Sequence, residues 1–178
     1  EHNIGYLLDS VLAQQLKTIS IREIVIIASG STDNTVGIVR KYRKQHKHIR
    51  ILLQKKRQGK ASAVNLFLSE SKSDILLLIG GDLLLKKNVI QKLVSKFKDT
   101  ETGMTGARPV PLNDIHDGLS GFAAHLLWEL HHRVSLSSPK MGEVVAFRKI
   151  FTRIPVLSSV DEANIEPLIR GQGYKVLY

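Results

Sequence analysis

EIVIIASGSTD, residues 23–33, joins an apolar run to a polar turn, and this junction decides the fold. Residues 23–28 have the pattern of a strand that is apolar on both faces, as in a buried parallel sheet. The turn at 29–33 then supplies an N-cap for a helix expected at 34–46. A strand that leads through a polar turn into a helix is the repeating unit of α/β sheets.

The same alternation continues in both directions from this junction. Helical periodicity predicts helices at 3–16, 60–71, 88–98, 118–136 and 163–169. Short β-rich runs predict strands at 49–53, 75–79, 102–108, 143–147 and 174–178. We therefore expect an α/β protein with a mainly parallel sheet flanked by helices.

Length and composition exclude several classes of protein. The chain has 178 residues, 43% of them hydrophobic, which is enough for one domain with a real core. It has no cysteine, which excludes a disulfide scaffold and cysteine-ligated metals, and which fits a reducing cytoplasm. The longest apolar run, at 75–81, is far shorter than the roughly 18 residues that cross a bilayer. Residues 1–16 are amphipathic, unlike a signal peptide.

Positive charge is concentrated in one part of the chain. The net charge is +10, and residues 34–69 contain many lysines and arginines but no acidic residue. Such a field attracts nucleic acid, anionic lipid or a nucleotide diphosphate, although the basic residues at 40–47 equally suit a solvated helix face. Tyr42 is the only aromatic residue between positions 34 and 64, which makes a nucleic-acid site the least favoured of these.

Three predicted strands end in polar or glycine-rich turns, at 29–33, 54–60 and 80–82. Ligands of open α/β sheets bind beyond the carboxyl ends of the strands, and the helix that follows each turn can hold phosphate with its N-terminal amides. Neither a Walker A motif nor GxGxxG is present, so the P-loop and dinucleotide-binding classes are not supported.

Six segments in order resemble the family 2 glycosyltransferases of GT-A fold, a group that includes dolichyl-phosphate mannose synthases and cellulose synthase-like enzymes. They are EHNIGYLLDSVLAQQ (1–15), EIVIIASGSTDNT (23–35), QKKRQGKASAVN (54–65), DILLLIGGDLLLKKNVIQKL (74–93), GEVVAFRK (142–149) and DEANIEPLIRGQGYKV (161–176). The resemblance implies a Rossmann-like sheet of GT-A type. It also implies one catalytic domain over 1–178, with a nucleotide-sugar half at 1–108 and an acceptor half at 109–178.

The resemblance also implies a site for a nucleotide-sugar donor. Asp82 matches the last Asp of the family's DxD, which holds Mg²⁺ or Mn²⁺ against the donor phosphates. The residues that match the family's donor-binding positions are Ser29 and Gly30 beside the nucleoside, Arg57, Gly59 and Lys60 beside the diphosphate, and Asn65.

Two acidic residues match the position of the family's catalytic base. By alignment Glu162 is the base, and its neighbour Asp161 remains the alternative. The resemblance implies an inverting transfer to a hydroxyl of a lipid phosphate, polysaccharide or glycan, at the cytoplasmic face of a membrane or in the cytoplasm. Arg148 matches the arginine of the family's FRR, and we expect it to orient the acceptor or to pair with one of these acids.

The sequence also departs from the family pattern. Ala28 and Ser29 replace a pair of Asp residues, and Gly80 replaces the first Asp of the DxD, so that metal affinity should fall unless another ligand fills its place. The family's first strand, which normally precedes residue 1, is absent, which predicts a gap between the strands at 23–28 and 75–79. We hypothesise that the chain is a trimmed portion of a longer polypeptide, or that upstream residues are disordered.

Some interpretations remain open at this level. The apolar stripe of the helix at 118–136 is interpreted as core; the alternative is a membrane-surface helix that carries Leu127, Trp128 and Arg133, with Lys140 beyond it. The rivals to an enzyme of this family are a non-catalytic glycosyltransferase-like binding or scaffold module, which Gly80 and Ala28 favour, and a nucleotidyltransferase.

Overall fold

The computed structural model describes residues 1–156 and 161–178, and of residues 161–163 it describes the backbone alone. The strands form two sheets. In the smaller sheet, β1 (Ile24–Ser29) pairs in parallel with β2 (Ile49–Gln54). The larger sheet has the order β3-β5-β4-β6 and comprises β3 (Ile75–Ile79), β4 (Thr102–Gly106), β5 (Val144–Arg148) and β6 (Lys175–Leu177).

Strand β5 is the reversed strand of the larger sheet. It pairs antiparallel with both β3 and β4, whereas β4 and β6 are parallel. The other strands of each sheet run in one direction, so the prediction of an α/β fold with a mainly parallel sheet is confirmed.

Helices cover both sheets, and their bounds follow the predicted ranges closely. They are α1 (Ile4–Leu12), α2 (Thr35–Gln45), α3 (Lys60–Glu70), α4 (Val89–Ser95) with the 3₁₀ turn η1 (Lys96–Lys98), α5 (Gly118–Ser137) and α6 (Asp161–Gly171). Helix α1 ends four residues before its predicted end, because the chain beyond it bonds to the segment before α4. There Gln15 N–H donates to Lys87 O over 2.6 Å, and Gln14 Nε2 donates to Lys86 O over 2.8 Å.

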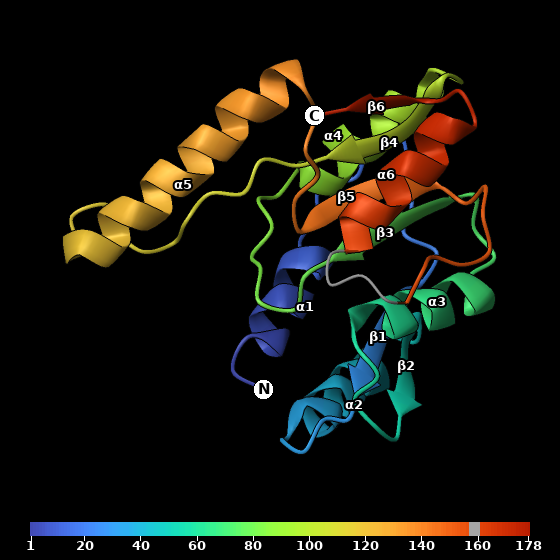
Figure 1. The fold of residues 1–178 in the computed structure, drawn as a ribbon. Coiled ribbons are helices and arrows are strands. Elements are labelled where there is room, and N and C mark those ends of the chain that lie inside the picture. The colour runs from blue at the N-terminus through green and yellow to red at the C-terminus, as the bar shows by residue number, and fades with distance from the viewer. Residues whose placement is uncertain (157–160) are drawn as a thin grey trace.

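The core has three parts. One lies between the larger sheet and helices α3 and α6, around the fully buried Phe147, Ile165 and Ile169. A second joins α1 and α2 to the smaller sheet, and the third packs α4 against β5. Both sheets thus have an apolar layer beneath their helices. Figure 1 shows how the helices and the two sheets are arranged.

No hydrogen-bonded ladder joins β1 to β3 within the described residues. The predicted gap between these two strands is therefore confirmed. Buried strand edges normally pair their backbone groups. Here the edges of β1 and β3 are unpaired with each other, and a pocket lies between the two sheets.

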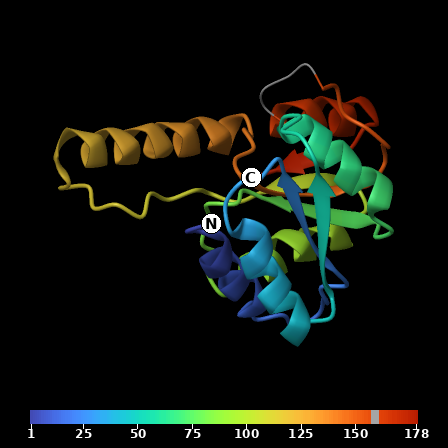
Figure 2. The ribbon, with the colours of Figure 1, turned by 90° about the horizontal axis from the view of Figure 1, so that it is seen from below.

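Helix α5 projects away from the body of the molecule, attached through the segments on either side of it (Figures 1 and 2). Its apolar stripe faces solvent: Leu119 is 84% exposed and Leu127 is 63% exposed. Leu126, Leu130 and Val134 are exposed as well. The prediction that this stripe is core is wrong, because no other described element covers it.

Two contacts attach α5 near its C-terminal half. Glu129 forms an ion pair with Arg108 over 2.9 Å, and the ring of Tyr178 lies against the rings of His131 and His132. No helix among the described residues is long and apolar enough to cross a membrane.

Candidate functional site

A pocket of about 620 Å³ lies at the carboxyl ends of β1 and β2. We call it the donor pocket, because its lining includes most of the predicted donor-binding residues. They are Ser29, Gly30, Arg57, Gly59 and Lys60, together with Ser31, Thr32 and Asp33 from the first turn. The structure therefore brings together the turns at 29–33 and 54–60, which follow β1 and β2.

Strand register explains why the two turns meet. Ser29 and Gln54 are paired at the last position of the β1–β2 ladder, so both turns leave the sheet at one level. Gly30 N–H donates to Gln54 O over 2.9 Å, and Gly30 has φ +60°. A Cβ atom at Gly30 would lie 2.6 Å from the backbone nitrogen of Arg57, so only glycine allows this close approach.

The turns are also fixed by hydrogen bonds. Ser29 Oγ accepts from Gln58 N–H and donates to Lys56 O, both over 3.4 Å. At the start of α2, Asp33 Oδ1 accepts from Thr35 N–H over 3.1 Å, but the N-cap residue is Asn34 and its side chain makes no capping hydrogen bond, so the prediction of an N-cap within 29–33 is wrong. The bonds of Ser29 connect the two turns that form the rim of the donor pocket.

The donor pocket suits an anion. Helix α3 begins there: its N-cap is Gly59, which has no side chain to bond the first amides of the helix. The amides at such an N-terminus and the helix dipole favour a phosphate group. Arg57 is exposed at the rim, and no hydrogen bond or ion pair to its guanidinium is found within the described part of the chain. The pocket thus offers a guanidinium, an ammonium group and a helix N-terminus to one ligand.

The third strand end lies beside this pocket. Gly80 is buried directly after β3, and Asp82 is exposed two residues later. Gly80 N–H donates to Glu143 O over 3.0 Å, and Glu143 Oε2 accepts from Lys60 Nζ over 3.2 Å. Lys60 therefore links the donor pocket to the turn that carries Asp82.

Glu143 was missed in the sequence. It comes directly before β5, and its position beside Gly80 depends on the antiparallel pairing of Ile79 with Val144. Sequence periodicity predicts both strands but not their pairing. The one available signal was the GEVVAFRK segment, in which an acid follows the glycine.

No three His, Cys, Asp or Glu side chains gather as a metal site within the described part of the chain. Among the described side chains, the carboxylates of Asp82 and Glu143 lie beside Gly80 at the third strand end. Mg²⁺ is commonly held by only one or two carboxylates, with substrate phosphates and water as its other ligands. These two side chains therefore fit a cation that is completed by a bound diphosphate.

Asn65 lies outside the donor pocket and points elsewhere. Its Nδ2 donates to Ile154 O over 3.0 Å, and its Oδ1 accepts from Ile154 N–H over 2.7 Å. Arg148 is likewise engaged with backbone: its guanidinium donates to Thr102 O over 2.8 Å and to Phe97 O over 3.1 Å. Both side chains thus bond to backbone groups in this structure, and their predicted roles stay predictions.

The predicted base residues begin helix α6. Asp161 is its first residue and Glu162 its second. Their side chains lie outside the described residues, so their roles stay predictions.

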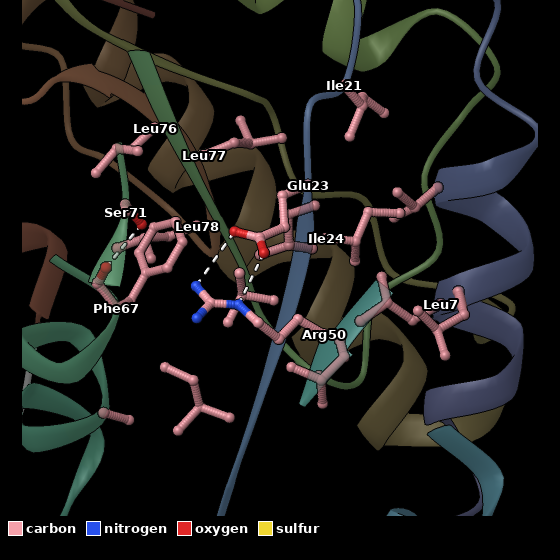
Figure 3. A pocket seen from close by; sticks show the side chains of 18 of the residues that line it. Leu7, Ile21, Glu23, Ile24, Arg50, Phe67, Ser71, Leu76, Leu77 and Leu78 are labelled. Atoms are coloured by element: carbon pink, nitrogen blue, oxygen red, sulfur yellow. Dashed lines mark hydrogen bonds and ion pairs between the residues drawn. The ribbon is translucent and has the colours of Figure 1, made fainter. Parts of the chain in front are cut away.

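A larger pocket of about 1300 Å³ fills the gap between β1 and β3 (Figure 3). Its walls are mainly apolar side chains, including Leu7 from α1, Phe67 from α3 and Leu76 from β3. Its lining residues also form ion pairs: Arg50 Nε lies 2.7 Å from Glu23 Oε1, Arg50 Nη1 lies 2.9 Å from Glu70 Oε2, and Lys60 pairs with Glu143. Lys60, Gly80 and Glu143 line this pocket too, whereas Arg57 and Gly59 line only the smaller one, which is therefore the better candidate for the donor.

Comparison with known proteins points to one family. The sequence profile described as Glycosyl transferase family 2 matches residues 1–131. A dolichyl-phosphate beta-glucosyltransferase (ALG5C) from Trichomonas vaginalis is 35% identical over 80 residues, which are 45% of this chain and 24% of that protein. The glycosyltransferase GlyG from Streptococcus pneumoniae is 29% identical over 101 residues, 56% of this chain and 34% of GlyG. The chain thus spans about a quarter to a third of the length of these relatives.

Solved structures share the fold over the whole chain. The mannosyltransferase PcManGT from Pyrobaculum calidifontis, in complex with GDP-Man and Mn²⁺, superimposes with a TM-score of 0.76 at 22% identity, covering 99% of this chain and 50% of PcManGT. TarS 1–349 from S. aureus, in complex with UDP-GlcNAc, gives a TM-score of 0.66 at 16% identity, covering 100% of this chain and 52% of TarS 1–349. The fold is the GT-A fold, and the chain belongs to glycosyl transferase family 2.

Proposed function

We propose that the chain is the donor-binding and catalytic domain of an inverting glycosyltransferase. It transfers a sugar from a nucleotide-diphosphate sugar to a hydroxyl acceptor and uses Mg²⁺ or Mn²⁺. One observation carries the proposal: the turns after β1 and β2 meet in one pocket that is lined by Ser29, Arg57 and Lys60 and faces the N-terminus of α3.

Different residues of the chain bind the diphosphate and the nucleoside of the donor. The guanidinium of Arg57, the ammonium group of Lys60 and the first amides of α3 bind the diphosphate. Ser29 and Gly30 lie at the end of β1 and contact the nucleoside. Since Ser29 stands where the family has a carboxylate, its hydroxyl offers a neutral hydrogen bond to the base in place of a charged one.

Asp82 holds the divalent cation. When bound, the cation neutralises the diphosphate as it leaves. This assignment is supported by the side chains at the third strand end, because carboxylate oxygens suit a hard cation. The structure of PcManGT contains both GDP-Man and Mn²⁺, which is the same combination of donor and metal.

The acceptor is deprotonated by an acid at the start of α6. Glu162, or Asp161 in its place, takes the proton of the acceptor hydroxyl as that oxygen attacks the anomeric carbon. The bond to the diphosphate breaks as the new glycosidic bond forms, so a single displacement inverts the anomeric configuration.

A lipid-linked acceptor at a membrane surface fits the shape of the molecule best. Helix α5 exposes an apolar stripe that no other described element covers, and the chain has a net charge of +10, which favours anionic head groups. One relative is a dolichyl-phosphate beta-glucosyltransferase, which acts on a lipid phosphate. We place the domain at the cytoplasmic face of a membrane.

Calorimetric titration with UDP-, GDP- and dTDP-linked sugars, with and without Mn²⁺, tests the donor site. We expect metal-dependent binding of one donor and its loss in Asp82→Asn. Asp74→Asn is the matched control, because Asp74 precedes β3 at the opposite end of the same strand. Absence of binding by all donors at any Mn²⁺ concentration would contradict the proposal.

The base is tested by Glu162→Gln and Asp161→Asn. The variant that abolishes turnover while leaving donor affinity intact identifies the base. If the chain binds a donor tightly but transfers no sugar to lipid phosphate or glycan acceptors, it is a binding module, as the departures at Ala28 and Gly80 would then explain.

A further inference from the structure

Glycine at position 80 leaves room for a carboxylate from elsewhere. A Cβ atom built on Gly80 would lie 2.9 Å from Glu143 Oε2 and 3.3 Å from Asp82 Oδ1. A side chain at this position would therefore lie beside both carboxylates. Gly80 is not among the glycines with positive φ, so backbone geometry does not explain the choice of glycine.

Glu143 reaches this place because of strand pairing. It precedes β5, and its carbonyl accepts the Gly80 N–H over 3.0 Å, which fixes the two backbones side by side. Its side chain is 43% exposed and extends past Gly80 to Lys60 Nζ, 3.2 Å away. The carboxylate is thus held at the strand end by a buried ladder and not by a mobile loop.

We infer that Glu143 supplies the carboxylate that Gly80 lacks, so that Glu143 and Asp82 together bind the divalent cation. This inference rests on the proposed function and names a second residue of its metal site. The two oxygens lie within 3.3 Å of one point, and two carboxylates with phosphate oxygens are a usual ligand set for Mg²⁺.

Lys60 gives the arrangement a second use. Its ion pair with Glu143 neutralises one carboxylate while no cation is present, which limits repulsion between Glu143 and Asp82. A cation bound by Glu143 competes with this pair for the carboxylate.

Mn²⁺ binding measured by electron paramagnetic resonance, alone and with UDP or GDP, tests the inference without relying on turnover. We expect Glu143→Gln to lower Mn²⁺ affinity in the presence of nucleotide by about tenfold or more, since removal of even an outer-shell partner costs about that much. Affinity for the metal-free nucleotide should not fall, because Glu143→Gln removes a negative charge beside Lys60. Glu101→Gln is the control, because Glu101 pairs with Lys175 at the opposite end of the larger sheet.

A relocated carboxylate gives the sharper test. In Glu143→Ala combined with Gly80→Asp, the new side chain occupies the space that Glu143 vacates, and Mn²⁺ affinity should recover relative to Glu143→Ala alone. A merely structural role of Glu143 would not produce this recovery, and thermal unfolding of each variant checks that it is folded.

The outcomes separate the two proposals. If Asp82→Asn loses Mn²⁺ while Glu143→Gln binds it like the wild type, the inference is overturned and the proposed function stands. If the wild type binds no Mn²⁺ with any nucleotide, the metal-dependent function and the inference both fail.

Discussion

Asn65 and Ile154 hold each other through two hydrogen bonds, although 89 residues separate them in the sequence. The amide of Asn65 donates to the carbonyl of Ile154 over 3.0 Å and accepts its N–H over 2.7 Å. Ile154 is fully buried beneath α3, so the pair joins this helix to the chain that follows β5. A side chain that satisfies a backbone donor and acceptor together behaves as a substitute for a missing strand partner.

We therefore predict that Asn65 stabilises the fold and does not bind the donor. Asn65→Ala should lower the free energy of unfolding by about 2 kcal/mol, because two hydrogen bonds are lost and a buried N–H is left without a partner. Asn65→Asp keeps the acceptor and should lose about half as much. Urea unfolding measures both changes. A large loss of nucleotide affinity in a folded Asn65→Asp would restore the family-based assignment.

The close approach of Gly30 to Arg57 gives a second prediction. Gly30→Ala places a Cβ atom 2.6 Å from the Arg57 nitrogen and puts alanine at φ +60°, which costs roughly 1–2 kcal/mol before the clash is counted. We expect lower stability and weaker nucleotide binding, because the second turn must move. Gly171→Ala is the control: that glycine ends α6 with open space around it and no positive φ, so the change should be neutral or stabilising.

The local elements and the donor pocket could be predicted because their signals are local. Strands and turns depend on neighbours in sequence, and parallel strands place their carboxyl ends at one edge. The order β3-β5-β4-β6 could not be predicted, since pairing depends on residues far apart. Glu143 was missed for that reason: its importance follows from pairing with the end of β3.

The error at α5 has a different cause. A stripe of Leu and Phe along one helix face indicates that this face packs against a partner, but it does not identify the partner. The same periodicity describes a helix packed on a sheet and a helix that projects from the body. Side-chain positions of Arg148 and Asn65 were likewise beyond the sequence, because their partners are backbone groups that only the fold brings near.

The link between α1 and α2 should depend on pH. Tyr42 Oη lies 2.7 Å from Asp9 Oδ1, and this hydrogen bond, helped by burial, raises the pKa of Tyr42 to about 12. A raised pKa means that the folded state keeps the proton longer than the unfolded state, in which Tyr ionises near about 10. The stabilisation is therefore complete below about pH 10 and is lost as the pH rises towards about 12.

Tyr42→Phe tests this link. We expect it to lower the free energy of unfolding by about 1 kcal/mol at neutral pH. The difference from the wild type should shrink between about pH 10 and pH 12, measured by urea unfolding. A difference that stays constant over this range would show that packing of the ring, and not the hydrogen bond, accounts for the effect.

The exposed stripe of α5 predicts binding to lipid vesicles. Leu126 and Leu130 are one turn apart on the same face and are both about half exposed. Their burial in a lipid interface should contribute roughly 1–2 kcal/mol each, and the positive charge of the chain should add to it with anionic lipid. The wild type should therefore sediment with vesicles that contain anionic phospholipid, and less so at high salt.

Replacing both leucines with serine should reduce vesicle binding more than tenfold, since each tenfold change corresponds to about 1.4 kcal/mol. Leu53→Ser is the matched control, because Leu53 is a similarly exposed leucine on β2, away from α5. Light scattering gives the mass of the chain in the same buffers. A mass of two copies that falls to one in the double variant, with no binding to vesicles, would assign the stripe to a second copy of the chain, because an apolar face that is covered in a dimer is withdrawn from lipid.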